Sequence, residues 1–391
     1  MKRITGSYVE SSTLGEVVKA FVPCALPPQR PHLDIETYQD LNRKAEMALA
    51  RLSGVSGLVP SVDWLLYSAI RKEALLTSQI EGTQATITDL FDDEAGLAVS
   101  NTDDVEEVTN YIAAYRLVRE NLRNQTGLPI SVRLLCKAHK LLLKGVRGAG
   151  KRPGELRRSQ NWLGGTRPGN AIFVPPPANN VPELMSDLEK FIHDQPSYGE
   201  IVDGSGLQLP PLVVIALAHA QFETIHPFLD GNGRMGRLLI SALLEDFGLL
   251  PEPLMYLSGY LKQNQIEYYT LLSSIRKNGD WESWVRFFLK GVESSAAHAE
   301  ENIVKLASLV ASDRKKLLGS PKAGTASYRL FELLPMMPRF TVDRVKTALD
   351  ITFPTASAAV KALEDIGLIV ETTGLKKNRS FSYDQYIKLL S

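Results

Sequence analysis

The sequence contains very few cysteines, and this scarcity excludes two ways of stabilising a fold. Only Cys24 and Cys136 occur among 391 residues. Two thiols cannot build a disulfide framework, and they cannot complete a zinc site of four cysteines. The chain must therefore depend on an apolar core, for which its 44% of hydrophobic residues suffices. So little cysteine is typical of a reducing compartment.

The sequence also lacks a long hydrophobic run and an excess of charge of either sign. No stretch of 18 or more apolar residues occurs, so we expect no membrane span. Residues 1–21 contain no continuous apolar segment, so we expect no signal peptide. Lysine and arginine together number 44, as do aspartate and glutamate. This balance gives no general reason to expect binding to nucleic acid or membranes, and we expect a cytoplasmic protein.

Changes of pattern along the chain suggest three parts. A chain of this length predicts two or three domains, at about 100–200 residues each. Residues 1–33 are mixed in character and proline-rich near their end, and we expect them to form an arm. This arm and a following helical region make up residues 1–103. We expect a helical core over residues 104–318 and a small C-terminal domain over residues 319–391, which begins with the linker sequence GSPKAGTA.

Apolar residues at helical spacing predict a mainly α protein. Ser61–Glu81 has Ser61 as its expected N-cap and Gly82 as its stop signal. Leu212–Ile225 is so apolar that we expect a helix inside the core. Further helices are expected over residues 104–122, 131–144, 234–247, 263–277 and 281–318.

A segment rich in glycine, proline and arginine, residues 145–177, interrupts the helical pattern. Within it, Arg157–Leu163 and Ala171–Val174 have the composition of short strands. The connection GGTRPGN consists of strong turn formers. We therefore expect a β-hairpin here.

The most informative segment is HPFLDGNGRMGR, His226–Arg237, which joins two expected helices. Gly231 and Gly233 remove side chains where a backbone must approach a ligand closely. The helix that follows offers N–H groups and the positive end of its dipole to an anion. Arg234 and Arg237 lie three residues apart and share a helix face. Two guanidinium groups beside a glycine-rich helix start suit a polyphosphate.

Two more side chains of this segment indicate chemistry. Asp230 is placed to bind Mg²⁺, which proteins usually hold with one or two carboxylates, phosphate oxygens and water. His226 faces the same loop, and an imidazole is well suited to take a proton from an attacking hydroxyl. A purely structural corner between helices would not require all these residue types at fixed offsets.

His226–Arg237 resembles the signature of the Fic family, HPFx(D/E)GNGRxxR, at every position. The resemblance implies a mainly α fold with a Fic-type helical core and a β-hairpin flap. It also implies transfer of AMP from the co-substrate ATP, with Mg²⁺ as cofactor, to a Ser, Thr or Tyr hydroxyl of a target protein. By residue, it implies that His226 is the general base and Asp230 the Mg²⁺ ligand. The residues that would hold the nucleotide are Gly231, Asn232, Gly233, Arg234, Met235, Gly236 and Arg237.

An upstream segment, TSQIEG (Thr77–Gly82), resembles the inhibitory motif of the same family, (S/T)xxxE(G/N). The resemblance implies that Glu81 pairs with Arg237 in the nucleotide site and keeps the γ-phosphate from binding productively. The physical basis is competition, because a carboxylate and a phosphate seek the same guanidinium donors. A glutamate before a glycine at a helix end is common, so this motif depends on the downstream signature.

The resemblance gives roles to two less distinctive features. It implies that segment 157–174 is a flap that docks the target by strand addition through Ala171, Ile172, Phe173 and Val174. It also implies that Tyr269, with Tyr268 as the weaker candidate, lies against the adenine. The alternatives are a plain surface hairpin and aromatic residues that only fill the core. We expect His219 to be a core histidine, because its spacing from His226 fits no usual zinc motif.

Residues 319–391 have the pattern of a winged helix-turn-helix domain. Helices are expected over 327–334, 341–349 and 355–366, with Thr341 and Thr355 as N-caps, followed by short strands at 368–373 and 380–383. The third helix carries one basic residue, Lys361, which is less than a DNA-reading helix usually shows. Protein contact, self-association or target recruitment is at least as reasonable as DNA binding.

Three hypotheses remain open. The leading one is an autoinhibited protein adenylyltransferase. The second keeps the fold but has the site remove AMP, with Glu81 orienting a water molecule, or use another nucleotide donor. The third is an ATP-sensing regulator that binds DNA through its C-terminal domain. Self-AMPylation, homodimerisation and the identity of the target stay undecided at this level.

Overall fold

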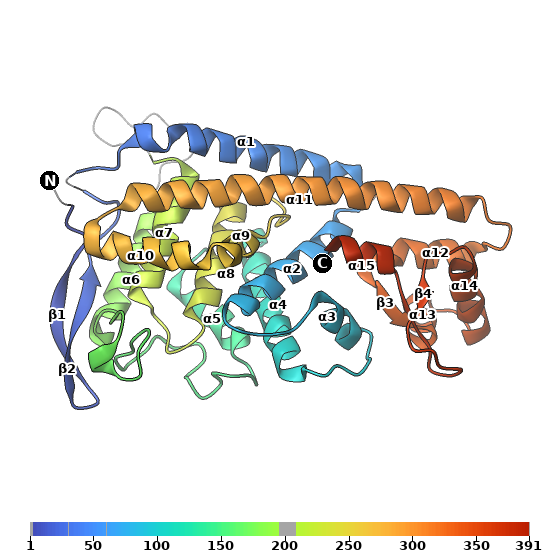
Figure 1. The fold of residues 1–391 in the computed structure, drawn as a ribbon, viewed down its shortest axis with the longest axis horizontal. Coiled ribbons are helices and arrows are strands. Elements are labelled where there is room, and N and C mark those ends of the chain that lie inside the picture. Colours follow the sequence, from blue (N-terminus) through green and yellow to red (C-terminus); the bar gives the residue numbers. More distant parts are fainter. Residues whose placement is uncertain (1–2, 30, 60, 195–208, 391) are drawn as a thin grey trace. The chain divides into compact units, whose positions relative to one another are not determined.

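The computed structural model describes residues 3–29, 31–59, 61–194 and 209–390. These residues form a predominantly helical protein with a few short strands (Figure 1), which confirms the expected fold class. None of the described helices is long and apolar enough to cross a membrane. The helices are α1 (Gln39–Val55), α2 (Val62–Ile80), α3 (Ile87–Glu94), α4 (Thr102–Arg123), α5 (Val132–Leu142), α6 (Val181–His193), α7 (Pro211–Ile225), α8 (Asn232–Asp246), α9 (Leu257–Gln263), α10 (Gln265–Asn278), α11 (Trp281–Leu318), α12 (Thr325–Leu333), α13 (Val342–Leu349), α14 (Phe353–Asp365) and α15 (Asp384–Leu390). The strands are β1 (Gly6–Thr13), β2 (Glu16–Pro23), β3 (Arg339–Thr341), β4 (Val370–Glu371) and β5 (Ser380–Ser382).

The chain forms two compact units, whose boundaries differ from the three consecutive parts expected from the sequence. The first unit consists of Met1–Ala50, Asn110–Pro253 and Leu257–Ala296. The second consists of Arg51–Thr109, Leu254–Tyr256 and Ala297–Ser391. Three helices, α1, α4 and α11, contribute residues to both units. A helix is continuous in sequence but can pack on different neighbours along its length, so its pattern alone does not mark a unit boundary.

Helix α7 is the core of the first unit and packs against α6 and α8. Every side chain from Leu212 to Ile225 is buried, which confirms the expected core helix. The contact between α7 and α8 is close at Gly236, where an added Cβ would lie 2.5 Å from Oε1 of Glu223. His219 is buried beside this contact, with its Nδ1 3.1 Å from the carbonyl oxygen of Gly236. It is therefore the core histidine that we expected.

Residues expected to form an N-terminal arm instead contain a β-hairpin, drawn in dark blue in Figure 1. Strands β1 and β2 pair in antiparallel register from Gly6↔Pro23 to Thr13↔Glu16. Between them, Leu14 and Gly15 have φ values of 51° and 79°, as a two-residue type I′ turn requires. Serines and charged residues dilute the apolar alternation of these strands, so the sequence pattern did not reveal them.

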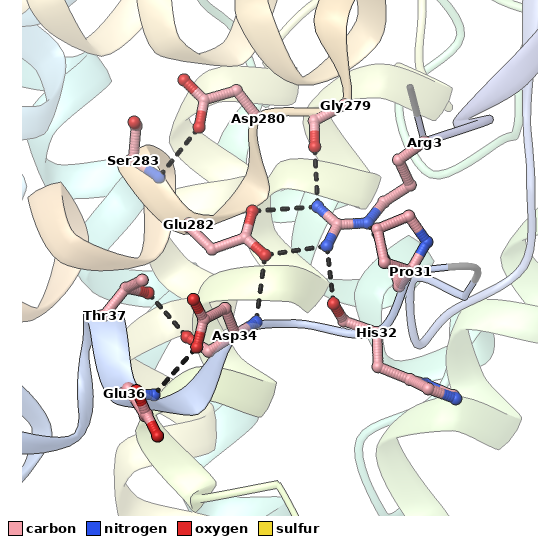
Figure 2. Close-up of polar contacts among 10 residues, drawn as sticks. All are labelled: Arg3, Pro31, His32, Asp34, Glu36, Thr37, Gly279, Asp280, Glu282 and Ser283. Carbon is pink, nitrogen blue, oxygen red and sulfur yellow. Dashed lines mark hydrogen bonds and ion pairs between the residues drawn. The ribbon is translucent and has the colours of Figure 1, made fainter. Parts of the chain in front are cut away.

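The chain before β1 is anchored to the first unit by Arg3 (Figure 2). Its guanidinium makes a two-pronged ion pair with Glu282, with N···O distances of 2.7 and 2.9 Å. It also donates to the carbonyl oxygens of Pro31, His32 and Gly279 at 2.7–2.8 Å. Such charge-assisted bonds are strong when they are mostly buried, and they hold the start of the chain against the N-terminal end of α11.

The second unit contains α2, and its ends agree with the sequence prediction. The hydroxyl of Ser61 accepts a hydrogen bond from the amide of Asp63 as the N-cap. The helix ends at Ile80 with Glu81 as its C-cap residue, and Gly82 follows with a φ of 100°. Within the unit, the buried Arg71 pairs with Glu94 of α3 at 2.6 Å.

The C-terminal elements belong to the same unit as α2 and α3. Helices α12, α13 and α14 pack together, and the strands form a sheet in the order β3-β5-β4. Thr341 caps α13 as expected. The prediction that Thr355 is an N-cap is wrong, because the hydroxyl of Thr352 caps α14 and accepts a hydrogen bond from the amide of Thr355. Arg339 of β3 pairs with Asp92 of α3 at 2.5 Å. The winged-helix assignment itself stays a prediction.

Candidate functional site

The turn between α7 and α8 reverses the chain with two residues in the left-handed region. His226 is the C-cap of α7, with φ 52° and ψ 62°, and its N–H donates to the carbonyl oxygen of Phe222 at 2.9 Å. Gly231 is the N-cap of α8, with φ 76°. Glycine adopts this conformation without cost, but for histidine it is strained. Strained residues of this kind gather at functional sites, where the surrounding structure holds them in place.

The side chain of Asn232 closes this turn. Its Oδ1 accepts from the N–H of Phe228 at 2.8 Å, and its Nδ2 donates to the carbonyl oxygen of the same residue at 2.9 Å. The side-chain amide is buried and fully engaged in shaping the loop. The implied contact between Asn232 and the phosphates stays a prediction. Its backbone N–H, and not its side chain, would have to make that contact.

The start of α8 directs backbone N–H groups toward the turn and carries two arginines, Arg234 and Arg237. The first hydrogen bond of the helix joins the N–H of Met235 to the carbonyl oxygen of Gly231 at 3.0 Å. The N–H groups of residues 232–234 precede this ladder and point out of the N-terminal end of the helix. Arg234 and Arg237 are both buried. Cations beside a helix N-terminus favour the binding of an anion.

Two residues of the segment pack into the core. The side chain of Met235 is completely buried. Gly236 faces α7, where its carbonyl oxygen contacts His219 and its lack of a side chain makes room for Glu223. The packing of the two helices accounts for both residues, and their implied contact with the nucleotide stays a prediction.

Asp230 lies beside a space that a glycine keeps open. The N–H of Gly231 donates to Oδ1 of Asp230 at 2.6 Å, and 36% of the Asp230 side chain is exposed. A Cβ added at Gly148, whose φ is 92°, would lie 2.8 Å from Oδ2. The residues present fit a Mg²⁺ ion held by one carboxylate. Among the described residues no three His, Cys, Asp or Glu side chains gather as a metal site, so such an ion would take its other ligands from phosphate and water.

His139, which the sequence analysis missed, supports the backbone of Asp230. Its Nε2 lies 2.9 Å from the carbonyl oxygen of Asp230, and the N–H of Gly154 donates to its Nδ1 at 2.8 Å. The neutral Nε2–H tautomer satisfies both bonds. The ring stacks on Phe228 with 3.8 Å between centroids. Burial lowers the pKa of His139 to about 4, which keeps the imidazole neutral at physiological pH.

Arg157, also missed, holds the other end of the turn. Its Nε donates to the carbonyl oxygen of His226 at 2.8 Å, and its backbone N–H donates to that of Pro227 at 2.9 Å. No sequence signal distinguishes Arg157 from its neighbour Arg158, because backbone acceptors far along the chain leave no mark in the sequence.

The segment expected as a β-hairpin forms a loop with a single bridge between Leu163 and Phe173. The two-stranded pairing that we expected was too extensive, because glycines 164 and 165 directly follow Leu163 and three prolines, 175–177, come soon after Phe173. Of the four predicted docking residues, Ile172 alone is mostly exposed, at 77%. The carbonyl oxygen of Val174 accepts the N–H of Phe21 at 3.0 Å, so β2 lies along this segment.

Two predicted site residues lie outside the turn. Glu81 is the C-cap of α2 and belongs to the second unit, and its implied pairing with Arg237 stays a prediction. Tyr269 is 46% exposed on α10, with its ring 4.9 Å from that of Tyr268. Tyr268 is a core residue, because it is buried and its hydroxyl lies 2.8 Å from Nε2 of His219. The role of Tyr269 at the adenine stays a prediction.

Two protein-family models match this chain. Residues 39–120 match the model of the Fic/DOC family N-terminal region, and residues 129–244, which include the turn, match the model of the Fic/DOC family. Together the two matches cover about half of the chain. The chain therefore belongs to the Fic/DOC family, which confirms the resemblance of His226–Arg237.

Individual relatives agree with this assignment. The chain is 26% identical over 259 residues to proteins named Protein adenylyltransferase Fic from Culex quinquefasciatus and from Aedes aegypti. Each match covers 66% of this chain and 46% of the relative, so the chain spans about half the length of the curated relatives it matches.

Solved structures show the same fold. A Fic family protein from Desulfovibrio desulfuricans G20 has a TM-score of 0.57 at 21% identity and covers 90% of this chain and 98% of its own. Fic-1 (residues 134–508) from C. elegans has a TM-score of 0.51 at 21% identity and covers 69% of this chain and 75% of its own. Identities this low show a shared fold and nothing finer.

Proposed function

We propose that this chain is a protein adenylyltransferase that uses Mg-ATP to place AMP on a Ser, Thr or Tyr hydroxyl of a target protein. One observation carries the proposal: a single turn carries His226 at the end of α7, Asp230 with a partly exposed carboxylate, and the N-terminal end of α8. The names of the relatives from Culex quinquefasciatus and Aedes aegypti support it.

The reaction assigns a step to each part of the turn. His226 accepts the proton of the acceptor hydroxyl. The hydroxyl oxygen bonds to the α-phosphorus of ATP while the bond from that phosphorus to the bridging oxygen of the β-phosphate breaks, and pyrophosphate leaves. The amides of Asn232 and Gly233, with Arg234 and Arg237, hold the β- and γ-phosphates and stabilise the charge that develops there, because the Gly231 N–H already donates to Asp230. A Mg²⁺ ion held by Asp230 would neutralise part of this charge.

The proposal includes a brake at Glu81. A carboxylate that pairs with Arg237 would compete with the γ-phosphate for the same guanidinium donors. ATP would then bind in a pose in which its α-phosphorus is not in line with the acceptor oxygen. Removal of the carboxylate is expected to restore the productive pose.

The test is transfer of label from α-labelled ATP in a cytosolic extract with Mg²⁺. We expect Glu81→Gly to label proteins well above the wild type, and a Glu81→Gly, His226→Ala double variant to label none. The adenylyltransferase assignment fails if Glu81→Gly transfers no label or if the double variant labels equally well. The brake alone fails if Glu81→Gly only matches an active wild type.

The same assay separates the other hypotheses. Label from γ-labelled ATP would indicate phosphoryl transfer with release of ADP, label from another α-labelled nucleotide would indicate another donor, and loss of label from a previously modified target would indicate AMP removal. A labelled band at the mass of this chain would reveal self-AMPylation. A salt-sensitive, sequence-selective DNA shift that survives His226→Ala would favour the regulator.

A further inference from the structure

Arg157 is a buried cation whose partners are all backbone carbonyl groups. Arg157 is only 2% exposed. Nε donates to the carbonyl oxygen of His226 at 2.8 Å, and Nη2 donates to those of Pro176 at 2.6 Å and Ile225 at 3.3 Å. Nη1 donates to the carbonyl oxygen of Ser159 at 3.3 Å. Among the described residues, no carboxylate lies within ion-pair distance of Arg157.

The placement of this guanidinium explains how His226 keeps its strained backbone. The last carbonyl groups of a helix have no acceptor role within it, and the helix dipole makes that end partly negative. Ile225, the last residue of α7, is completely buried, so its carbonyl group depends on a donor from the protein. Arg157 provides both the hydrogen bonds and the positive charge at the carbonyls of Ile225 and His226. Burial lowers the pKa of Arg157 to about 10, and it therefore remains protonated at neutral pH.

The same guanidinium ties the turn to the flap segment. Arg157 begins that segment, and Pro176, whose carbonyl oxygen it also bonds, lies two residues after the predicted docking residues at 171–174. Two neighbours add bonds of the same kind: Gln160 donates to the carbonyl oxygen of Pro175 at 2.8 Å, and Asn161 donates to that of Phe228 at 3.2 Å. One side chain thus fixes the backbone of His226 relative to both ends of the flap.

We propose that Arg157 is a positioning residue, whose guanidinium sets the direction of the His226 imidazole relative to the docked acceptor hydroxyl. It acts through the carbonyl group of His226. The inference rests on the proposed function, because it gives Arg157 a task only if His226 is the base and the flap docks the target. It adds to that function a link between the site that takes the proton and the surface that presents the hydroxyl.

Lysine cannot replace arginine in this task. Its ammonium is a compact charge, whereas the planar guanidinium spreads its donors toward four separate carbonyl oxygens. Arg157→Lys keeps the buried positive charge but loses the arrangement of hydrogen-bond donors. A misplacement of about 1 Å at a reacting group can cost about 10²-fold in rate. We therefore expect kcat to fall about 10²-fold in Arg157→Lys, with a change of no more than about two-fold in the dissociation constant of ATP.

The experiment uses the full chain with Glu81→Gly and measures single-turnover transfer from α-labelled ATP, ATP binding by calorimetry, and the urea unfolding midpoint. Arg158→Lys is the matched control, because Arg158 is the adjacent residue, its side chain is 73% exposed, and it pairs with Glu155 at 3.1 Å on the surface. We expect the control to retain its rate. We further expect guanidinium ion at millimolar concentration to restore part of the rate of Arg157→Ala and to leave that of His226→Ala unchanged.

Two results would overturn the inference while the proposed function stands. One is a folded Arg157→Lys with an unchanged kcat. The other is a loss of rate in Arg157→Lys that is explained by weaker ATP binding or by a lower urea unfolding midpoint, together with no rescue of Arg157→Ala by guanidinium. That result would show that Arg157 has only a structural role. If the Glu81→Gly chain and the Arg158→Lys control transfer no label, the proposed function falls and this inference falls with it.

Discussion

Gly148 and Asp230 face each other across the candidate metal site, although 145–154 and 226–237 are separate segments of the chain. A Cβ added at position 148 would lie 2.8 Å from Oδ2 of Asp230, and the φ of 92° at Gly148 strains any other residue. The space beside this carboxylate therefore depends on a glycine in a different loop. It is the space that an ion and a phosphate oxygen would need.

Substitution of Gly148 is expected to weaken the use of Mg²⁺. In Gly148→Ala, the new methyl group displaces the Asp230 carboxylate, and the Mg²⁺ concentration for half-maximal transfer should rise about tenfold or more, as for other supports of metal ligands. Gly150→Ala is the matched control, because nothing lies within 4 Å of its added Cβ. Equal Mg²⁺ dependence of the two variants would contradict the placement of the metal at Asp230.

Substitution of the exposed flap residue is expected to weaken labelling of the target but not binding of ATP. Ile172 is 77% exposed, and Ile172→Glu should lower the efficiency of target labelling about tenfold, a loss of about 1.4 kcal/mol. ATP binding, followed by calorimetry, should not change. Ile266 on α10 is 87% exposed, so Ile266→Glu is the control for an added surface charge. If both variants label the target at the same rate, the flap does not dock it through Ile172.

The close contact of α7 and α8 is expected to exclude any side chain at position 236. The Cβ of Gly236→Ala would lie 2.5 Å from Oε1 of Glu223 and 3.2 Å from Cε1 of His219. Such overpacking costs about 1–3 kcal/mol of the free energy of unfolding. Gly54→Ala, in the helix α1 with nothing within 4 Å, should instead stabilise by up to about 1 kcal/mol. Urea unfolding measures both, and a stabilised Gly236→Ala would refute the close contact.

The buried histidine His219 is expected to make stability depend on pH. Burial lowers its pKa to about 3, whereas an unfolded chain has a histidine pKa of about 6.5. The unfolded state therefore binds the proton more tightly. The stabilisation is fully present above pH 6.5 and is lost as the pH falls from 6.5 toward 3. The slope approaches about 1.4 kcal/mol per pH unit for this residue.

The measurement is the free energy of urea unfolding at pH 7.5 and at pH 5. We expect His219→Gln to lose less stability between these values than the wild type does. Burial also lowers the pKa of His139, to about 4, so part of the dependence of stability on pH remains in His219→Gln. His32→Gln is the control, because the His32 side chain is exposed. A His219→Gln chain with the full pH dependence would show that this imidazole is not the source.

Local chemistry in the sequence predicts several features that the structure bears out. Ser61 and Thr341 cap their helices because a hydroxyl near the first free amides is favourable in any context. The prediction fails at Thr355, where Thr352 stands three residues earlier and caps the helix instead. Both hydroxyls satisfy the local rule, and only the path of the preceding chain decides between them.

By itself, the sequence determined the helical class and the family, because apolar periodicity and the segment His226–Arg237 are local properties. Only the tertiary structure decided that the C-terminal elements share a unit with α2, that residues 6–23 pair as strands, and that Arg157, His139 and Gly148 surround the turn. The physical reason is common to these cases. Each depends on a backbone group or a space that a distant segment supplies. Backbone groups are nearly the same in every residue, so the pattern of side chains along the sequence does not indicate these contacts.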